Sequence, residues 1–175
     1  MPSYTDEKTG ITYVSDANFT ESGESKGVSP TYKGETNPQQ FWNVRSFPDG
    51  DRNCYTLTPS QGKGMRYLIR ARFMYGNYDN KNQTRLFNLS LGVDHWDTIK
   101  IEDASSRTTK EIIHVPSSDH MYVCLVNTGN GTPFISVLEL RQLGIEFYTS
   151  QSGTSLKLHA HYDFSPEDSD SYTRL

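Results

Sequence analysis

Residues 93–98, VDHWDT, bring two carboxylates and an imidazole close together in the sequence. Aspartate and histidine side chains are common general acids and bases, so this stretch could serve a hydrolytic reaction. Strand alternation would place Asp94 and Trp96 on one face and His95 and Asp97 on the other, which separates groups that would have to cooperate. The sequence also lacks a G-x-S-x-G, P-loop or H-E-x-x-H motif. We therefore predict no catalytic residue and no cofactor.

His159 and His161 are the residues best spaced to bind a metal ion. At positions i and i+2 they would share one face of a strand. A zinc site needs three or four ligands, however, and no third ligand is evident. We predict that the two imidazoles lie on a solvated face and that there is no metal site.

A binding site is predicted where a strand rich in aromatic residues runs into a polar loop. Tyr75, Tyr78 and Asp79 lie there, and Trp96 could join them if the loops meet. Sugar sites stack apolar ring faces on Tyr or Trp and fix hydroxyl groups with Asp, Asn or Arg. We predict that these four residues bind a ligand and that Tyr78 presents its ring on an exposed rim. The alternative is that aromatic side chains fill the core and its margin, with Tyr78 folded over the sheet edge.

Arg66, Arg70 and Arg72 form a basic row on one face of the strand predicted at residues 65–75. Such a row could receive carboxylates from a binding partner. It could also pair with Asp and Glu side chains on neighbouring strands of the same sheet. We expect local pairing.

The strands that must position these residues can be predicted from apolar residues that recur at every second position. In residues 65–75, MRYLIRARFMY, every odd position is apolar or aromatic, as in a strand with one buried face. No segment shows the apolar stripe of a helix, so we predict an all-β antiparallel two-sheet sandwich or jelly roll with at most one or two short helical turns. The other predicted strands are residues 11–14, 41–44, 53–58, 86–93, 98–101, 111–115, 121–127, 134–140 and 155–161.

The segments between these strands carry turn and loop signals. Residues 18–40 are polar and rich in Gly, Ser and Pro, so we predict a long surface loop. Asn130-Gly131 predicts a hairpin turn, because both residues tolerate positive φ. We expect one domain over residues 3–164 and a disordered acidic tail over residues 165–175.

Composition and short motifs limit the classes of binding partner and the cellular compartment that we expect. The net charge of −4 argues against nucleic-acid binding. No apolar run approaches the ~20 residues of a membrane span, and the first residues do not resemble a signal peptide. Four sequons favour export of the parent protein, and alternation places Asn88 on an outer strand face. The sequons begin at Asn18, Asn82, Asn88 and Asn130.

Cys54 and Cys124 lie within two predicted strands and leave two interpretations open. They could form a disulfide bond, which would close a long loop and contribute on the order of 4 kcal/mol in the chain-entropy model. They could equally be two buried thiols in the core of a sandwich.

Several stretches in the same order resemble the malectin-like region of plant leucine-rich-repeat receptor-like kinases, over about residues 3–163. The resemblance implies a β-sandwich of the malectin type outside the cell, usually the first of a tandem pair, in a receptor that also has repeats, one membrane helix and a serine/threonine kinase domain. The sequence shows none of those further parts, so we expect it to correspond to the first sandwich. The stretches are SYTDEKTGITYVSD, FWNVRSFPDGDRNCYTL, YLIRARFMYGNYD, LGVDHWDT and VCLVNTGNGTPFISVLELR.

The family resemblance also implies a function. Animal malectin binds glucose-capped N-glycans through loop aromatics and an Asp, and its aromatic loop aligns near residues 75–81. Plant members look more like receptors for peptides, co-receptors or cell-wall carbohydrate. We therefore expect a non-catalytic extracellular recognition module, with a carbohydrate-binding lectin as the alternative and a glycoside-active or accessory jelly roll as a distant one. Family members usually carry an Asp-Cys-Gly motif upstream of Ser3, and its Cys could be the partner of Cys54 or Cys124.

Overall fold

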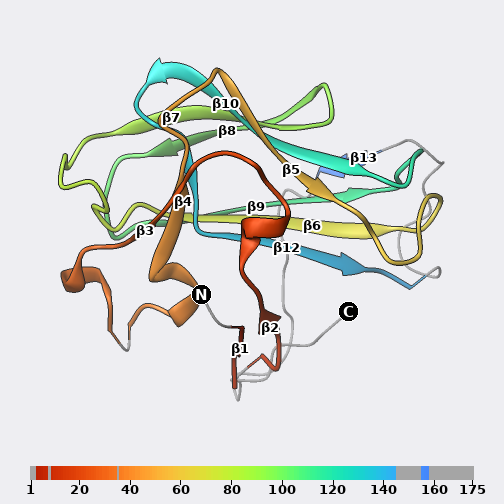
Figure 1. The fold of residues 1–175 in the computed structure, drawn as a ribbon, viewed down its shortest axis with the longest axis horizontal. Coiled ribbons are helices and arrows are strands. Elements are labelled where there is room, and N and C mark those ends of the chain that lie inside the picture. Colours follow the sequence, from red (N-terminus) through yellow and green to blue (C-terminus); the bar gives the residue numbers. More distant parts are fainter. Residues whose placement is uncertain (1–2, 8, 35, 145–154, 158–175) are drawn as a thin grey trace.

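The computed structural model describes residues 3–7, 9–34, 36–144 and 155–157. Two four-stranded sheets lie face to face, in the strand orders β5-β10-β7-β8 and β12-β6-β9-β13 (Figure 1). All their strand pairs are antiparallel. The eight strands of this sandwich are β5 (Arg52–Leu57), β6 (Tyr67–Met74), β7 (Arg85–Leu91), β8 (Asp94–Ile101), β9 (Arg107–His114), β10 (Met121–Asn130), β12 (Val137–Gln142) and β13 (Ser155–Lys157).

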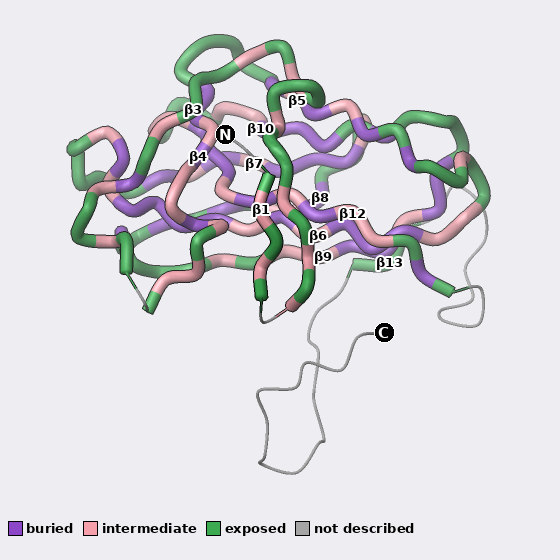
Figure 2. Tube along the Cα trace, turned by 60° about the horizontal axis from the view of Figure 1, so that its bottom comes forward, coloured by how far each residue is buried: buried purple, intermediate pink, exposed green. Residues whose placement is uncertain are grey.

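The core lies between the two sheets, where their alternating apolar residues meet. On β6, Ile69, Ala71 and Phe73 are completely buried, as the period of two predicts. The ring of Phe73 meets the ring of Phe87 on β7 at a centroid distance of 5.8 Å, in an edge-to-face contact between the sheets. Buried segments run along β6, β7 and β10 through the middle of the molecule (Figure 2). The predicted antiparallel sandwich is confirmed.

Two small sheets add to the sandwich. One has the order β11-β4-β3, and the other is the hairpin β1-β2 near the N-terminus. The prediction of a loop over residues 18–40 was therefore wrong in part, because β3 forms there and Val28 is buried. The side chains of β3 are mostly exposed, so no apolar alternation reveals it. The elements are β1 (Tyr4–Thr5), β2 (Thr12–Tyr13), β3 (Glu24–Gly27), β4 (Asn43–Ser46) and β11 (Phe134–Ile135).

Three short 3-10 helices exceed the one or two helical turns that the sequence predicted. They are η1 (Asp16–Asn18), η2 (Pro30–Tyr32) and η3 (Gln39–Phe41). A second difference concerns Asn130, which we placed in a hairpin turn. It ends β10 opposite Leu86, and the chain then passes to β11 in another sheet. Positive φ falls on Gly129 and Gly131 and not on Asn130.

Two members of the predicted basic row, Arg70 and Arg72, pair with acidic side chains of neighbouring strands, as expected. Arg70 donates to Glu111 on β9 and lies 3.2 Å from Glu139 on β12. Arg72 lies 3.8 Å from Glu139, and Arg141 of β12 lies 2.8 Å from it. Glu139 is therefore the centre of a charge network on the outer face of this sheet.

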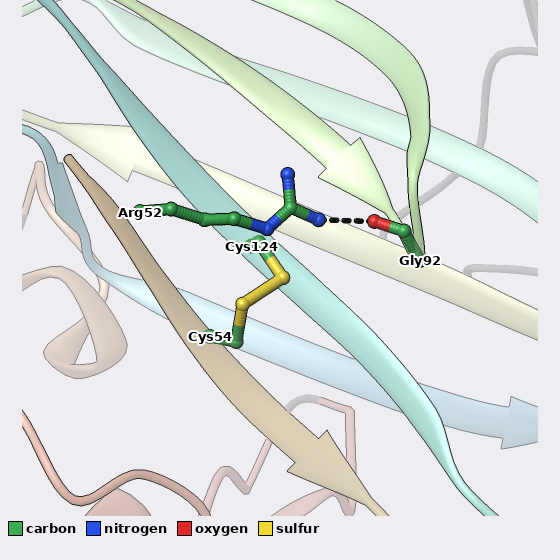
Figure 3. The surroundings of a disulfide bond; sticks show 4 residues. All are labelled: Arg52, Cys54, Gly92 and Cys124. Carbon is green, nitrogen blue, oxygen red and sulfur yellow. Dashed lines mark hydrogen bonds between the residues drawn. A yellow bond between two sulfur atoms is a disulfide. The ribbon is translucent and has the colours of Figure 1, made fainter.

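Cys54 and Cys124 form a disulfide bond, which decides between the two interpretations of the sequence. The residues are directly opposite each other on β5 and β10 (Figure 3). Arg52, on the same edge strand, donates to the backbone carbonyl of Gly92 in the turn after β7. The cross-link therefore fastens an edge strand to its sheet.

Some predictions concern residues outside the described ranges. These are His159, His161, the end of the strand predicted at residues 155–161, and the tail at residues 165–175. Within the described ranges, no helix has the length and apolar character needed to cross a membrane.

Candidate functional site

The loop between β6 and β7 is tightly folded, as its glycine and asparagines predict. Gly76, Asn77, Asn80 and Asn82 all have positive φ, a conformation that these residue types tolerate best. A Cβ atom on Gly76 would lie 2.5 Å from the Cβ atom of Val28, so this position has room only for glycine. The loop is thus held in one shape against the segment after β3.

Tyr75 and Asp79 come together in this loop, and the structure adds Arg85 to them. Arg85, at the start of β7, is 1% exposed and donates to Asp79 Oδ2 at 2.6 Å and to the Tyr75 hydroxyl at 3.1 Å. The Tyr75 hydroxyl donates to Asp79 Oδ1. The guanidinium also lies 4.8 Å from the centroid of the Tyr75 ring, in a cation–π contact. The three side chains form one polar cluster at the margin of the core.

The hydrogen bonds of this cluster set its electrostatics. Burial would raise the pKa of Asp79, but hydrogen bonds from Tyr75, the Lys81 backbone and Arg85 hold it below the usual value of 3.8. Burial and the neighbouring carboxylate raise the pKa of Tyr75 to about 12. At neutral pH the cluster therefore contains a carboxylate, a guanidinium and a neutral phenol.

The prediction that Tyr78 presents an exposed ring is wrong. Its side chain is 8% exposed and belongs to the hydrophobic core. The ring packs against Tyr75 at 5.4 Å and against Phe134 of β11 at 5.5 Å. Its hydroxyl accepts a hydrogen bond from Ser46 of β4 at 3.2 Å. Tyr75 is also buried, so neither ring offers a free face on which a sugar could stack.

Trp96 does not join this loop. It is 4% exposed, and it is the extra residue of a bulge, since Ser90 pairs with His95 and Leu89 with Asp97. It therefore lies across from the end of β7, whereas Arg85 lies at the start, five residues or roughly 16 Å away. The four predicted binding residues do not form one site.

The acid and base candidates beside Trp96 are also separated. Asp94 and His95 are exposed, while Asp97 binds Lys110 of β9 at 3.2 Å and Lys157 of β13 at 2.8 Å. Burial opposes the charge on Asp97, but these lysines keep its pKa lowered. Asp97 thus ties the two sheets together at one edge. In the parts of the chain that the structure covers, no group of three or more His, Cys, Asp or Glu side chains could hold a metal ion.

The asparagines of the four sequons differ in how far they are exposed to solvent. Asn18, Asn82 and Asn130 are exposed. Asn88 is half-buried on the outer face of β7, and its side-chain oxygen accepts a hydrogen bond from Thr98 at 2.9 Å. The prediction that Asn88 lies on the outer face is confirmed.

A second candidate site is a cavity of about 430 Å³ at one open side of the sandwich. We call it the edge cavity. Its floor comprises inward residues of the edge strands β5 and β12, and residues 11–19 run across it from one sheet to the other. The Tyr13 hydroxyl donates to Glu139 of β12 at 2.9 Å, and the Phe19 carbonyl accepts from the Thr56 amide of β5 at 2.7 Å. Residues of the floor include Tyr55, Leu57, Leu138 and Leu140.

One wall of the edge cavity is an ion pair. Arg45 of β4 donates to both carboxylate oxygens of Asp16, at 2.6 and 2.7 Å, and the Tyr55 hydroxyl donates to Asp16 Oδ2 at 2.9 Å. Burial disfavours the charged form of Asp16, but the bonds from Arg45 and Tyr55 lower its pKa below the usual value. The opposite wall contains Glu139 with its own arginine partners.

Two residues of the edge cavity carry polar atoms that the protein leaves unsatisfied. The Tyr4 hydroxyl and Gln40 Oε1 are buried and have no hydrogen-bond partner among the described residues. Apolar side chains also line the opening, with Val14 62% and Phe19 37% exposed. The cavity therefore has an apolar mouth, and two unsatisfied polar atoms lie behind its lining, out of contact with solvent.

Sequence reasoning missed the residues that organise both sites. Arg85 carried a signal, because its parity matches the inward residues Phe87 and Leu89 and a buried arginine needs a carboxylate nearby. Asp16 and Arg45 carried no such signal, since 29 positions separate them and Asp16 lies outside the predicted strands.

The chain matches the family model of the malectin-like domain over residues 1–175. It is 53% identical over 146 residues to the putative leucine-rich repeat receptor-like protein kinase At2g19210 of Arabidopsis thaliana. That match covers 83% of the chain but only 17% of the kinase, so the chain spans about a sixth of the length of this relative.

Solved structures support the same fold. The ectodomain of ANX1 from Arabidopsis thaliana superposes with a TM-score of 0.70 at 16% identity, over 89% of this chain and 45% of that one. A chain of the crystal structure of the plant peptide RALF23 in complex with FER and LLG2 superposes with a TM-score of 0.66 at 13% identity, over 82% of this chain and 47% of that one. At these identities the likeness concerns the fold alone.

Proposed function

Because this chain belongs to the malectin-like domain family, we propose that it is a ligand-recognition module in the ectodomain of a plant receptor-like kinase. The observation that carries the proposal is the 53% identity to the corresponding region of such a kinase. A module of this kind binds a ligand outside the cell, while the kinase activity belongs to another part of the receptor. The structure is consistent with that role, since a cavity lies at one open side of the sandwich.

A peptide, or a protein co-receptor, is the ligand class that we favour. In the related structure of FER, the receptor is in a complex with the peptide RALF23 and the protein LLG2. That complex is a property of FER, and it supports peptide recognition in this chain only by analogy. We propose no catalytic role, because Asp94, His95 and Asp97 do not converge and Asp97 is neutralised by two lysines.

An extracellular location fits the covalent structure. Disulfide bonds persist mainly in oxidising compartments, and Cys54 and Cys124 are joined. The three exposed sequons could carry N-glycans in the secretory pathway, and we propose Asn88 as a fourth, less accessible site.

Carbohydrate recognition is the alternative ligand class. Burial of Tyr75 and Tyr78 weakens it, because a sugar-stacking site needs an exposed ring face. A sugar could still bind elsewhere, so binding experiments must include neutral oligosaccharides beside peptides.

The test is to express the 175-residue chain behind a signal peptide and to measure the binding of extracellular plant peptides, with a glycan array in parallel. We expect peptide or co-receptor binding, and a gel shift on glycosidase treatment that disappears when all four sequon asparagines are replaced by glutamine. An unglycosylated product would contradict the compartment, and a chain that bound neither peptide nor protein would contradict the proposed function.

A further inference from the structure

The edge cavity has the size of a ligand site. Its volume of about 430 Å³ falls within the roughly 300–1,000 Å³ of pockets that bind small molecules. It lies between elements from distant parts of the chain, so its walls are fixed by the sandwich and by the hydrogen bonds that fasten residues 11–19 to both sheets.

The charges that line the edge cavity are already paired with one another. Asp16 accepts two bonds from Arg45, and Glu139 is neutralised by Arg70 and Arg141. A charged ligand would have to replace one of these partners, which would leave a carboxylate or a guanidinium unpaired. The walls therefore suit a neutral ligand.

The unsatisfied polar atoms define what such a ligand must supply. Gln40 Oε1 can only accept a hydrogen bond, so it requires a donor. The Tyr4 hydroxyl can donate, and burial raises its pKa to about 12, so it keeps its proton at neutral pH. A backbone amide unit supplies one N–H donor and one C=O acceptor, which matches this pair.

The opening of the edge cavity favours an apolar group. Val14 and Phe19 are two of the few large hydrophobic side chains that the described structure leaves exposed, and both line this cavity. The floor is also apolar, with Leu57 and Leu138 from the two edge strands. An apolar side chain entering here would remove both surfaces from water.

From these observations we propose that the edge cavity binds a neutral peptide segment, one apolar side chain of which enters between Val14 and Phe19, while its backbone bonds to the Tyr4 hydroxyl and Gln40 Oε1 once these two side chains turn toward the cavity. The inference rests on the proposed function, because it names the place where such a module would take its peptide. A sugar fits less well, because the carboxylates and guanidiniums that would bind hydroxyls are paired with each other. The rings of Tyr4 and Tyr13 are also less available to a sugar, because they stack on one another at a centroid distance of 5.4 Å.

The experiment selects ligands from a phage-displayed library of short random peptides on the full 175-residue chain and measures their dissociation constants. We expect peptides with an apolar anchor to be enriched, and Val14→Asp to weaken their binding by at least about tenfold. Val93→Asp is the matched control, because Val93 is 93% exposed in the turn after β7 and outside the cavity. It should leave the dissociation constant unchanged.

A second variant separates recognition from folding. Gln40→Leu removes the unsatisfied acceptor, so it should weaken the selected peptides while the melting temperature stays the same or rises. If binding and melting temperature fall together, Gln40 is structural and the proposed contact is wrong.

The remaining outcomes discriminate among the proposals. Enriched peptides that are insensitive to Val14→Asp and Gln40→Leu would overturn the edge-cavity proposal while peptide recognition itself survives. Binding of neutral oligosaccharides that Val14→Asp abolishes would assign the cavity to a sugar and overturn the peptide. Enrichment of no peptide would overturn this inference, and the proposed function would fall with it only if the chain also bound no protein co-receptor.

Discussion

The loop of residues 75–85 and the edge cavity are both built from tyrosines, carboxylates and arginines, yet they differ in how their polar atoms are satisfied. In the loop, the hydroxyls of Tyr75 and Tyr78 both have partners and Asp79 bonds to Tyr75 and Arg85, although the buried Arg85 Nε has no partner among the described residues. In the edge cavity, the ion pairs are satisfied, but the Tyr4 hydroxyl and Gln40 Oε1 are not. The two regions therefore have similar composition, but the tyrosine hydroxyls of the loop are bonded within the protein and the Tyr4 hydroxyl of the edge cavity is not.

This difference indicates which region stabilises the fold and which one can bind a ligand. A buried polar cluster whose members satisfy one another fixes the shape of the chain and leaves little for a ligand to gain. A buried polar atom without a partner already bears its desolvation cost, which a ligand can recover. The loop that the sequence marked for binding is thus the better candidate for stability, and the cavity that it did not mark is the better candidate for binding.

The largest expected effect tests the structural role of the loop. Tyr78→Ala removes a ring that packs on Tyr75 and Phe134, so we expect the free energy of unfolding to fall by about 3–5 kcal/mol, the usual range for buried aromatic truncations. Urea denaturation followed by tryptophan fluorescence would measure it. Tyr78→Phe is the control, since it keeps the ring and should cost only about 1 kcal/mol. A Tyr78→Ala protein of unchanged stability with lost peptide binding would restore the loop as a ligand site.

The fold could be predicted to a large extent because its core strands obey a period of two. The alternation in residues 65–75 identifies β6, and the inward parity of Phe87 and Leu89 identifies β7. Strand β3 could not be found, because it pairs by backbone bonds alone and buries little of its own side chains. The start of β8 was missed because a bulge at Trp96 interrupts the alternation.

The candidate sites were less predictable because they depend on contacts between distant residues. The period of two in residues 65–75 puts Tyr75 on the inward face, and Tyr75 is indeed buried; Gly76 and Asn77, which follow it, both have positive φ. Nothing near Tyr78 in the sequence, however, shows that Ser46 supplies a partner for its hydroxyl from 32 positions away. The edge cavity likewise arises only when residues 11–19 cross between two edge strands.

The next effect concerns the buried charge pair of the loop. Asp79→Asn leaves Arg85 buried without its anion, so we expect a loss of about 3 kcal/mol at neutral pH, near the lower end for broken buried ion pairs. Because the folded-state pKa of Asp79 lies below its usual 3.8, its charge stabilises the fold above that pH and ceases to do so as the pH falls through the folded-state value. The stability difference between wild type and variant should therefore shrink over the pH range below 3.8. A difference that is constant over this range would show that charge pairing is not its cause.

A smaller effect is expected for a single hydroxyl of the loop. Tyr75→Phe removes the donor to Asp79 and the acceptor for Arg85, while the ring contacts stay in place. We expect a loss of about 1–2 kcal/mol, because Asp79 and Arg85 each lose one hydrogen bond while they stay bonded to each other. Chemical denaturation would measure it, and a change below about 0.5 kcal/mol would contradict the view that this cluster is a satisfied structural unit.

The smallest effect is expected when a tyrosine hydroxyl is removed from the edge cavity instead of the loop. Tyr4→Phe also removes one buried phenolic oxygen, and the ring can still stack on Tyr13 at the same place. Because this hydroxyl has no partner among the described residues, its loss should change the free energy of unfolding by less than about 0.5 kcal/mol, or stabilise the protein slightly. Denaturation curves of Tyr75→Phe and Tyr4→Phe measured side by side would show whether the two regions differ as the hydrogen bonds indicate. If Tyr4→Phe costs as much as Tyr75→Phe, the hydroxyl is satisfied within the folded protein, and the edge cavity then offers a ligand no free donor at that position.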